Sequence, residues 1–503
     1  MRGERAAPRR WSPTVLLAAA GALGIAGYVV PAMQRIGYPY ELTYFEGSTV
    51  EVTARLLDGL PIYAPPSAEF VAWPYPPMYF WLTAGISEFS GLSLPTMRLV
   101  SFAASLIVLG LIALIVWWTT GSRVAALLGS GLYAATYRVA GAWADTARVD
   151  SVVLAWLLAA VAVAMRARTW RGGAVVGLLV VAAFLTKQNA ILAAAPLLVA
   201  LVIRRRAAGV AASVVAVVGS LATLVVGDIV TDGWYSPSVA FQLTGQPWAP
   251  QWLLGFWAID VLLPFALLVV VAGWVALRHR REWQWPRASG LSDQGVVVVA
   301  AVIGLLAAGI SGRLHDGGTS NVAMPAHVAV AIALAIAINW AFTSGRLPRS
   351  ELWVLGVAVL SQVVILLFWR TDIVPTEADR TAGDRFIDYV AALPGPVLIP
   401  SHPYYARLAG KPTTASTIPV VDMLASRSNR ARDALAAQLP WPLAGYTVVI
   451  ADSADDAARL GTELQRDFTL VTTDVVPGDA FEPVTDVPAK PSLVFVRTAE
   501  PLP

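Results

Sequence analysis

Residues 12–33 read SPTVLLAAAGALGIAGYVVPAM, an apolar run long enough to cross the roughly 30 Å hydrocarbon core of a bilayer as one helix. Four arginines precede this run: Arg2, Arg5, Arg9 and Arg10. Because basic residues are enriched on the cytoplasmic side of membrane helices, the pattern predicts a cytoplasmic N-terminus. The stretch TYFEG at 43–47 then lies on the extracytoplasmic side, and it carries the carboxylate Glu46.

The composition indicates that most of the chain lies in the membrane. Of 503 residues, 57% are hydrophobic and 14% are charged, which is too apolar for a soluble protein of this length. The absence of cysteine excludes disulfides, thiolate metal sites and a cysteine nucleophile. A net charge of +3 gives no indication of a nucleic-acid partner. We therefore expect a mainly α-helical, multi-pass protein of the plasma membrane. The high Ala, Val and Arg content fits a bacterial genome of high GC content, and the envelopes of such bacteria use mannosyl and arabinosyl carriers.

Apolar runs of about 17–25 residues, the length that spans a bilayer, predict about eleven membrane helices within residues 1–370. Their expected limits are 12–33, 97–118, 122–141, 150–167, 173–187, 189–203, 208–230, 255–277, 294–311, 325–344 and 351–369. The two shortest, 173–187 and 189–203, are separated by a brief polar turn and are expected to form a tight hairpin that meets the outer surface.

The distribution of basic residues supports this threading. Alternating sides from a cytoplasmic N-terminus puts the basic clusters inside: Arg166, Arg168, Arg171, Arg204, Arg205, Arg206, Arg278, Arg280, Arg281, Arg287, Arg346 and Arg349. The opposite loops carry isolated cations: Arg55, Arg148, Lys187 and Arg313. This asymmetry is the one that membrane insertion produces. An odd number of crossings places the C-terminus outside.

Residues 371–503 hold many of the acidic groups, including Asp372, Glu377, Asp379 and Asp384, and contain no apolar run of membrane length. Short β-like runs at 396–400, 446–450 and 492–496 alternate with helical patterns around 378–393, 427–438 and 453–466, which predicts a small extracytoplasmic α/β domain. This domain either caps the same surface as Glu46 or is a stabilising appendage with no role in chemistry.

The first extracytoplasmic loop, 34–96, is long and rich in aromatic residues and prolines. Residues 46–58 are predicted to form an amphipathic helix with Val50, Ala54 and Leu57 on one face, and such helices lie in the membrane interface. Aromatic residues at headgroup level need no functional explanation. A loop of this length also suits a site that holds a sugar against a lipid headgroup.

Glu46 is a candidate general base. A carboxylate in a partly apolar site is expected to have a raised pKa, closer to the range that suits a base. The alternative is that Glu46 begins the predicted helix, where a negative charge is favourable beside the helix N-terminus.

Asp145, Arg148 and Asp150 form a second polar cluster at the outer ends of two predicted spans. Ionisable groups at membrane depth are usually functional or paired. Arg148 could bind a carrier phosphate through its planar fork, or Asp150 could pair with it and hold two helices together. Asp145 could contact an acceptor or simply be solvated.

Two further outer loops carry cations. Lys187 lies among polar neighbours and could anchor a phosphate, although a lysine at a membrane surface also extends its amine into water. His315 could contact a phosphate or sugar or belong to a solvated turn, and two adjacent ligands, His315 and Asp316, are a poor metal signature. His402 could reach the site from the C-terminal domain.

Several of these motifs, in this order, resemble the GT-C superfamily of membrane glycosyltransferases. Glu46, GLPIY at 59–63 and YPPMY at 75–79 are most similar to the branch of protein O-mannosyltransferases and lipid A aminoarabinose transferases. Three later motifs match as well: Arg148-Val149-Asp150, Thr186-Lys187-Gln188-Asn189, and His315-Asp316-Gly317-Gly318 with Asn321 and Pro325.

The resemblance implies an inverting-type transfer of a sugar from a polyprenyl-phosphate donor to a lipid, glycan or protein acceptor at the outer face. Glu46 would be the general base, and the substrate or phosphate would be bound by Arg148, Lys187, His315, Asp145, Asp150, Tyr75 and Asn321. Those branches usually carry an Asp-Glu pair where this chain has Phe45-Glu46, which puts any mechanism needing two adjacent acids in doubt. No cofactor and no metal site are expected, and dependence on a divalent cation stays open.

The main alternative is a transporter or flippase for a lipid-linked sugar. Transporters often show repeated halves and polar groups near the bilayer midplane. Here the polar groups gather at one interface and no halves repeat, which favours the enzyme. A third possibility is a non-catalytic assembly partner that presents the C-terminal domain.

Overall fold

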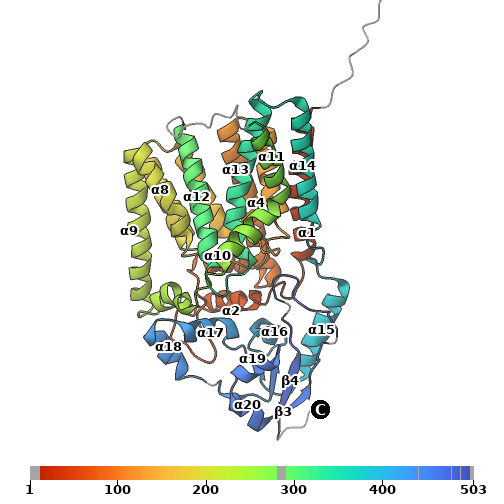
Figure 1. Cartoon of the computed structure of the whole chain (residues 1–503). Helices are drawn as coiled ribbons and strands as arrows, with labels where there is room; N and C mark the ends of the chain where they lie inside the picture. Colours follow the sequence, from red (N-terminus) through yellow and green to blue (C-terminus); the bar gives the residue numbers. More distant parts are fainter. Residues whose placement is uncertain (1–11, 280–290, 440, 477, 488, 499–503) are drawn as a thin grey trace, which may run out of the picture.

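The computed structural model describes residues 12–279, 291–439, 441–476, 478–487 and 489–498. A bundle of upright helices carries the C-terminal domain at one of its two ends (Figure 1). We call this end of the bundle the domain end and the opposite one the remote end. Several arginines used to predict the topology lie outside the described residues: Arg2, Arg5, Arg9, Arg10, Arg280, Arg281 and Arg287.

Each apolar run predicted from the sequence contains a helix. The upright helices are α1 (Thr14–Arg35), α4 (Leu94–Thr120), α5 (Arg123–Ala135), α6 (Asp150–Arg166), α7 (Trp170–Phe184), α8 (Ala190–Arg204), α9 (Arg206–Val230), α11 (Ala266–Arg278), α12 (Asp293–Arg313), α13 (Met324–Thr343) and α14 (Arg349–Leu367). Within the described residues, 7 helical segments are long and apolar enough to cross a membrane. The four segments α5 to α8 are shorter, so the expected eleven crossings stay a prediction.

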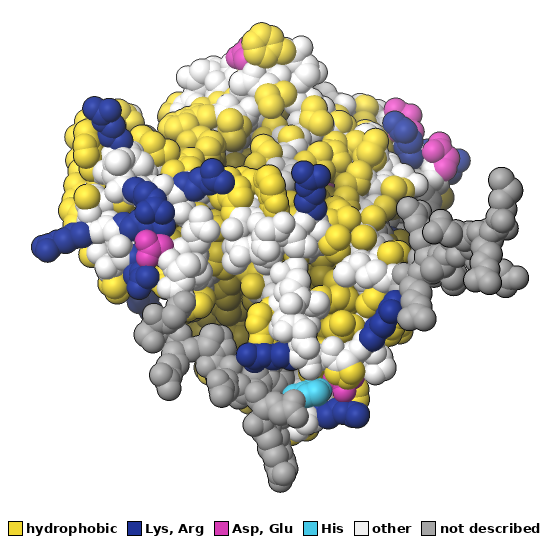
Figure 2. Space-filling model, turned by 90° about the horizontal axis from the view of Figure 1, so that it is seen from above, with side chains coloured by type: hydrophobic (Ala, Val, Ile, Leu, Met, Phe, Trp, Pro, Cys, Tyr) yellow, Lys and Arg dark blue, Asp and Glu magenta, His cyan; other side chains and the backbone are white. Residues whose placement is uncertain are grey.

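The helices alternate in direction as the charge pattern predicts. Seen from the remote end, Figure 2 shows Lys and Arg side chains spread over a largely apolar surface with fewer Asp and Glu. Three helices that start at this end, α5, α7 and α12, have hydroxyl N-caps, which accept the backbone N–H three residues on: Ser122, Thr169 and Ser292.

One close contact in the bundle depends on glycine. Gly24 of α1 meets α5 so closely that a Cβ there would lie 2.1 Å from the Gly131 carbonyl oxygen, so only glycine permits the contact.

One helical segment of the bundle is irregular. Between α10 (Trp252–Gly255) and α11 the helix passes through a π segment and a short 3₁₀ segment, η3 (Phe256–Leu262) and η4 (Leu263–Phe265). Gln362 accepts from the Leu267 N–H at 3.0 Å and donates to the Pro264 carbonyl at 2.9 Å, which satisfies the backbone around the proline.

The first outer loop forms α2 (Glu46–Leu57) and α3 (Met78–Ser90). The helix predicted at 46–58 is therefore confirmed, but its surroundings differ from the membrane interface expected for it. Residues 46–54 are all buried, and α2 lies across the domain end of the bundle with the C-terminal domain beneath it (Figure 1). Arg407 makes a bidentate ion pair with Glu51 of α2 at 2.8 and 2.7 Å, so the helix is held by protein on its polar side.

The C-terminal domain is α/β, as predicted. Its helices are α15 (Glu377–Ala392), α16 (Pro403–Leu408), α17 (Thr417–Ala425), α18 (Asn429–Ala436), α19 (Ala454–Arg459) and α20 (Thr462–Asp467). Its strands are β1 (Val397–Leu398), β2 (Val448–Ala451), β3 (Phe468–Thr472) and β4 (Leu493–Arg497). They form one sheet in the order β1-β2-β4-β3, with β1 and β2 parallel and the other pairs antiparallel. The sequence prediction missed β3, an edge strand whose central residues are exposed.

Two hydrophobic cores hold these parts together. One lies inside the bundle, while the second combines the first outer loop, the adjoining end of α4 and the C-terminal domain. Leu42 and Val50 from the loop and Tyr405 and Val449 from the domain belong to this second core. The domain is therefore fixed to the bundle through a shared core.

Candidate active site

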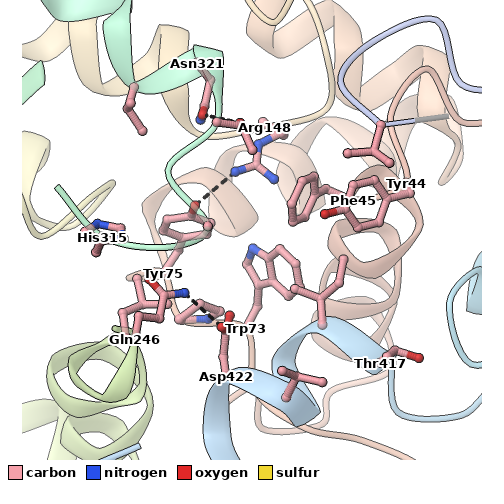
Figure 3. A pocket seen from close by; sticks show the side chains of 18 of the residues that line it. Tyr44, Phe45, Trp73, Tyr75, Arg148, Gln246, His315, Asn321, Thr417 and Asp422 are labelled. Atoms are coloured by element: carbon pink, nitrogen blue, oxygen red, sulfur yellow. Dashed lines mark hydrogen bonds between the residues drawn. The ribbon is translucent and has the colours of Figure 1, made fainter. Parts of the chain in front are cut away.

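A cavity of about 890 Å³ lies between the domain end of the bundle and the C-terminal domain. Its walls come from the first outer loop, the loops before α6 and α8, the loop between α12 and α13, and residues of the C-terminal domain. Figure 3 shows aromatic rings around Arg148 on one side of this space and Asp422 with Gln246 on the other. Leu192 on α8, which is exposed on the bundle surface, also lines the cavity and gives it an apolar side.

Five of the residues predicted for the site are brought together here. Asp150 bridges two cations: its carboxylate lies 3.4 Å from Nε of Arg148 and 2.7 Å from Nζ of Lys187. Asn321 donates to the same carboxylate at 3.2 Å, and Arg148 donates to the Tyr75 hydroxyl at 3.0 Å. The pairing of Arg148 with Asp150, one of two interpretations of the sequence, is thus present. It leaves the cluster with one net positive charge.

Arg148 is held over aromatic rings. Its guanidinium carbon lies 4.5 Å from the ring centre of Phe45, 5.0 Å from Trp143 and 5.7 Å from Tyr75. Such contacts orient a guanidinium at modest cost in solvation. They also give Phe45 a structural role at the position where the related branches carry an acid, because its ring supports Arg148.

One nitrogen of Arg148 has no partner. Its Nη1 is buried and receives no hydrogen-bond acceptor among the described residues, although the residue lines the cavity. A buried donor left unsatisfied costs roughly 1–3 kcal/mol, and more when it is charged. Nη1 is shielded from the cavity, so an anion bound there would satisfy this nitrogen only after the side chains around it shift.

His315 lies on the cavity wall, but it is not part of the cation cluster. Its Nδ1 is within 3.0 Å of the Asp316 carbonyl, and its backbone bridges to Trp248. The loops 246–251 and 314–318 are thereby paired, with the Asp316 N–H donating to the Pro247 carbonyl at 3.0 Å. His315 is placed to contact a ligand only from the side of the cavity that these loops form.

The environment of Glu46 differs from the one that the sequence predicted. It is fully buried and is not among the residues that line the cavity. Its carboxylate accepts two hydrogen bonds from Arg98, at 2.9 and 2.6 Å, and one each from the backbone N–H groups of Leu42 and Ala147, both at 2.7 Å. Burial raises the pKa of Glu46, but Arg98 and the backbone donors outweigh burial and lower the pKa below its ordinary value of 4.5. The expectation of a raised pKa is therefore wrong, because the sequence did not reveal the pairing with Arg98.

Asp145 is also buried away from the cavity. Its carboxylate accepts from Arg35 at 2.8 and 3.0 Å and from the Tyr137 hydroxyl at 2.7 Å. Neither acceptor contact nor solvation, the two alternatives from the sequence, describes this residue. It joins the end of α1 to the loop before α6.

His402 does reach the site, through an intermediary. The imidazole is buried, with Nδ1 2.5 Å from Glu41 and Nε2 3.1 Å from Asp452. Asp452 lines the cavity, and Glu41 lies in the first outer loop. Burial lowers the pKa of His402, but the carboxylates of Asp452 and Glu41 outweigh burial and raise it well above 6.5. His402 therefore ties the C-terminal domain to the loop that carries Glu46.

Sequence reasoning missed two groups of residues. Glu41, five positions before Glu46, is an acid of the first loop that was not considered. The C-terminal domain contributes four carboxylates to the cavity wall: Asp422, Asp452, Asp456 and Glu482. A usable signal for Asp422 was its isolation in the otherwise uncharged stretch TIPVVDMLA at 417–425. Among the described residues, no group of three or more His, Asp or Glu side chains is arranged to hold a metal ion.

Comparison with protein families gives one match. The family of dolichyl-phosphate-mannose-protein mannosyltransferases matches residues 75–228, a segment that contains Tyr75, Arg148, Asp150 and Lys187. No curated protein sequence matches the chain.

Two solved structures of ArnT show the same fold. ArnT from Cupriavidus metallidurans bound to undecaprenyl phosphate superimposes with a TM-score of 0.55 at 13% identity, covering 96% of this chain and 97% of ArnT. ArnT in the apo state gives a TM-score of 0.57 at 12% identity, with the same coverage. The archaeal oligosaccharyltransferase AglB from Archaeoglobus fulgidus gives 0.49 at 10% identity, covering 88% of this chain and 69% of AglB. The ArnT fold and the family match confirm the resemblance to GT-C glycosyltransferases of the mannosyltransferase and aminoarabinose transferase branch.

Proposed function

We propose that this GT-C-type protein moves a sugar from a polyprenyl-phosphate donor to an acceptor at the extracytoplasmic face of the plasma membrane. The observation that carries the proposal is the Nη1 of Arg148, a buried cationic donor that has no partner among the described residues and belongs to the wall of a large cavity. A guanidinium and an ammonium side by side suit a phosphate, because both can donate to its oxygens as charge develops on them.

The cluster around Asp150 prepares the cations for this role. The carboxylate fixes Arg148 and Lys187 in place but neutralises only one of their two charges. When the sugar leaves, the electron pair of the broken bond stays on the carrier phosphate, and the excess positive charge stabilises it. Because the leaving group is an anion, no general acid is needed. Because Arg148 and Lys187 already offset its charge, we expect transfer to proceed in the presence of EDTA.

The surroundings of the cluster fit the two ends of such a donor. Leu192 offers an apolar surface next to the membrane-facing side of α8, where a polyprenyl chain could lie. Tyr44 and Trp73 offer rings to a sugar (Figure 3). In this proposal Glu46 holds the loop in position beside Arg98 and is not the base. The extracytoplasmic assignment is supported by the basic residues at the remote end of the bundle (Figure 2).

A transfer assay with the purified full-length protein in liposomes tests the proposal. The donors are polyprenyl-phosphate carriers of radiolabelled mannose and of arabinose, and the acceptors are lipid, glycan and protein fractions of a bacterial envelope. We expect transfer from one donor by the wild type and a loss of at least tenfold for Arg148→Ala. Arg55→Ala, which removes an outer-loop cation that does not line the cavity, is expected to leave transfer unchanged. Translocation of the donor across the bilayer without transfer would instead support the transporter alternative.

A further inference from the structure

The C-terminal domain places acids opposite the cations of the bundle. Each of the four carboxylates on this wall has a partner. Oδ2 of Asp452 lies 3.1 Å from His402 Nε2, and its Oδ1 is buried. Asp456 accepts from the Ser401 hydroxyl at 3.0 Å, and Glu482 lies 3.6 Å from Lys490. Among the described residues, the fourth carboxylate, Asp422 on α17, is held by a single neutral donor, the Gln246 amide, and it faces Arg148 across the cavity (Figure 3).

Only one oxygen of Asp422 is occupied. Gln246 donates from Nε2 to its Oδ1 at 2.9 Å, and no donor among the described residues reaches Oδ2. Oδ2 is also not among the buried atoms without a partner, so it is open to the cavity. Figure 3 shows Asp422 across the cavity from Arg148, with the rings of Trp73 and Tyr75 beside the intervening space.

The orientation of Asp422 is fixed from outside α17. Gln246 begins the loop that pairs with 314–318, and a Cβ on Gly317 would lie 3.2 Å from its Nε2, so the amide is closely packed. Because the Gln246 amide occupies Oδ1, Oδ2 is the oxygen of Asp422 that remains free to accept a hydrogen bond. A carboxylate held in this way can accept a single proton from a directed hydroxyl.

The charges around Asp422 are few. Burial raises its pKa above 3.8, and the Gln246 amide and the positive potential of His315 only partly offset this rise. A raised pKa moves a carboxylate toward the range that suits a general base. Glu46, with a lowered pKa and no free oxygen, has the opposite properties.

We propose that Asp422 binds the hydroxyl group of the acceptor and takes its proton during sugar transfer. This inference rests on the proposed function. The acceptor oxygen forms a bond to the anomeric carbon while the bond from that carbon to the phosphate oxygen breaks. The electron pair leaves with the carrier phosphate at Arg148 and Lys187, and the acceptor proton goes to Oδ2 of Asp422. The donor would then be held mainly by the bundle and the acceptor by the C-terminal domain.

Asp422→Asn and Asp422→Glu, compared in the full-length protein, test this inference. Removing a general base lowers turnover by about 10²–10⁴-fold, so we expect that loss in kcat for Asp422→Asn, with binding of undecaprenyl phosphate unchanged. In the wild type kcat/KM falls as the pH drops through the pKa of Asp422, and the residual activity of Asp422→Asn is expected to lack this fall. Asp422→Glu, which keeps a carboxylate, should retain more activity and the acidic fall. Asp455→Asn, an exposed acid on α19 outside the cavity, is the matched control and should behave as the wild type.

The outcomes separate the inference from the proposed function. If Asp422→Asn transfers sugar at the wild-type rate, or if its residual activity keeps the acidic fall, the inference is wrong while the donor site stands. If Asp422→Asn and Asp422→Glu lose activity equally and both also lose undecaprenyl phosphate binding, Asp422 has a structural role only. If the wild type transfers no sugar from any donor, the proposed function fails and the inference fails with it.

Discussion

The substitution Glu46→Gln removes the charge of a buried carboxylate and keeps its size. The wild-type carboxylate accepts four hydrogen bonds, two of them from Arg98. A glutamine amide accepts through one atom only, so it leaves donors facing its NH₂ group and the Arg98 guanidinium without a counter-charge. Breaking a fully buried pair of this kind costs about 3–5 kcal/mol. Arg98 keeps its bonds to the Tyr38 and Tyr40 carbonyls, so we expect a loss near 3 kcal/mol in the free energy of unfolding.

The control is Glu51→Gln on the same helix. Glu51 also makes a bidentate pair, with Arg407, but that arginine is 36% exposed. Exposed pairs contribute about 1 kcal/mol or less. Unfolding followed by tryptophan fluorescence in detergent should therefore show a much larger decrease for Glu46→Gln than for Glu51→Gln.

Sugar transfer measured on the same samples decides between the two roles of Glu46. At a temperature where Glu46→Gln is folded, we expect transfer within a few-fold of the wild type. The reasoning would be refuted by an unchanged unfolding midpoint together with a loss of transfer of 10²-fold or more. That result would make Glu46 the general base, as the sequence first indicated.

Two further predictions concern pH. Because the pKa of Glu46 is lowered, the contribution of Glu46 to stability is complete above its unfolded pKa of 4.5 and is lost as the pH falls through the folded pKa. The difference in unfolding midpoint between the wild type and Glu46→Gln should therefore be constant from pH 7 to 5 and shrink in stronger acid. Because the pKa of His402 is raised, its contribution is complete below 6.5 and is lost as the pH rises through the folded pKa. The midpoint of His402→Gln should lie below that of the wild type at pH 6 and approach it in alkali, and a gap that stays constant from pH 6 to 10 would contradict the pairing with Glu41 and Asp452.

The helices and their direction could be predicted because they depend on local properties. Apolar length and the side of the basic residues are read directly from the sequence, and every predicted run contains a helix. Arg148, Asp150 and Lys187 could be found because each is an ionisable residue beside an apolar run. Their mutual contacts follow once these helix ends share one side of the bundle.

The partners of the buried carboxylates could not be predicted in this way. Arg98 lies 52 positions from Glu46 and Arg35 lies 110 positions from Asp145, so these pairs exist only in the packed fold. The same holds for Asp422, which faces Arg148 because the C-terminal domain shares a core with the first outer loop. Pairing lowered the pKa of Glu46 where apolar surroundings alone predicted a rise.

The central claim is that the cavity between bundle and C-terminal domain binds a carrier phosphate through Arg148 and Lys187. ArnT, which shares the fold, has been solved bound to undecaprenyl phosphate, and the same lipid is a suitable probe here. An experimental structure of this protein with undecaprenyl phosphate tests the claim most directly. We predict the phosphate within hydrogen-bonding distance of Arg148 Nη1 and Lys187 Nζ. A phosphate bound elsewhere on the bundle, with Nη1 still without a partner, would contradict the account.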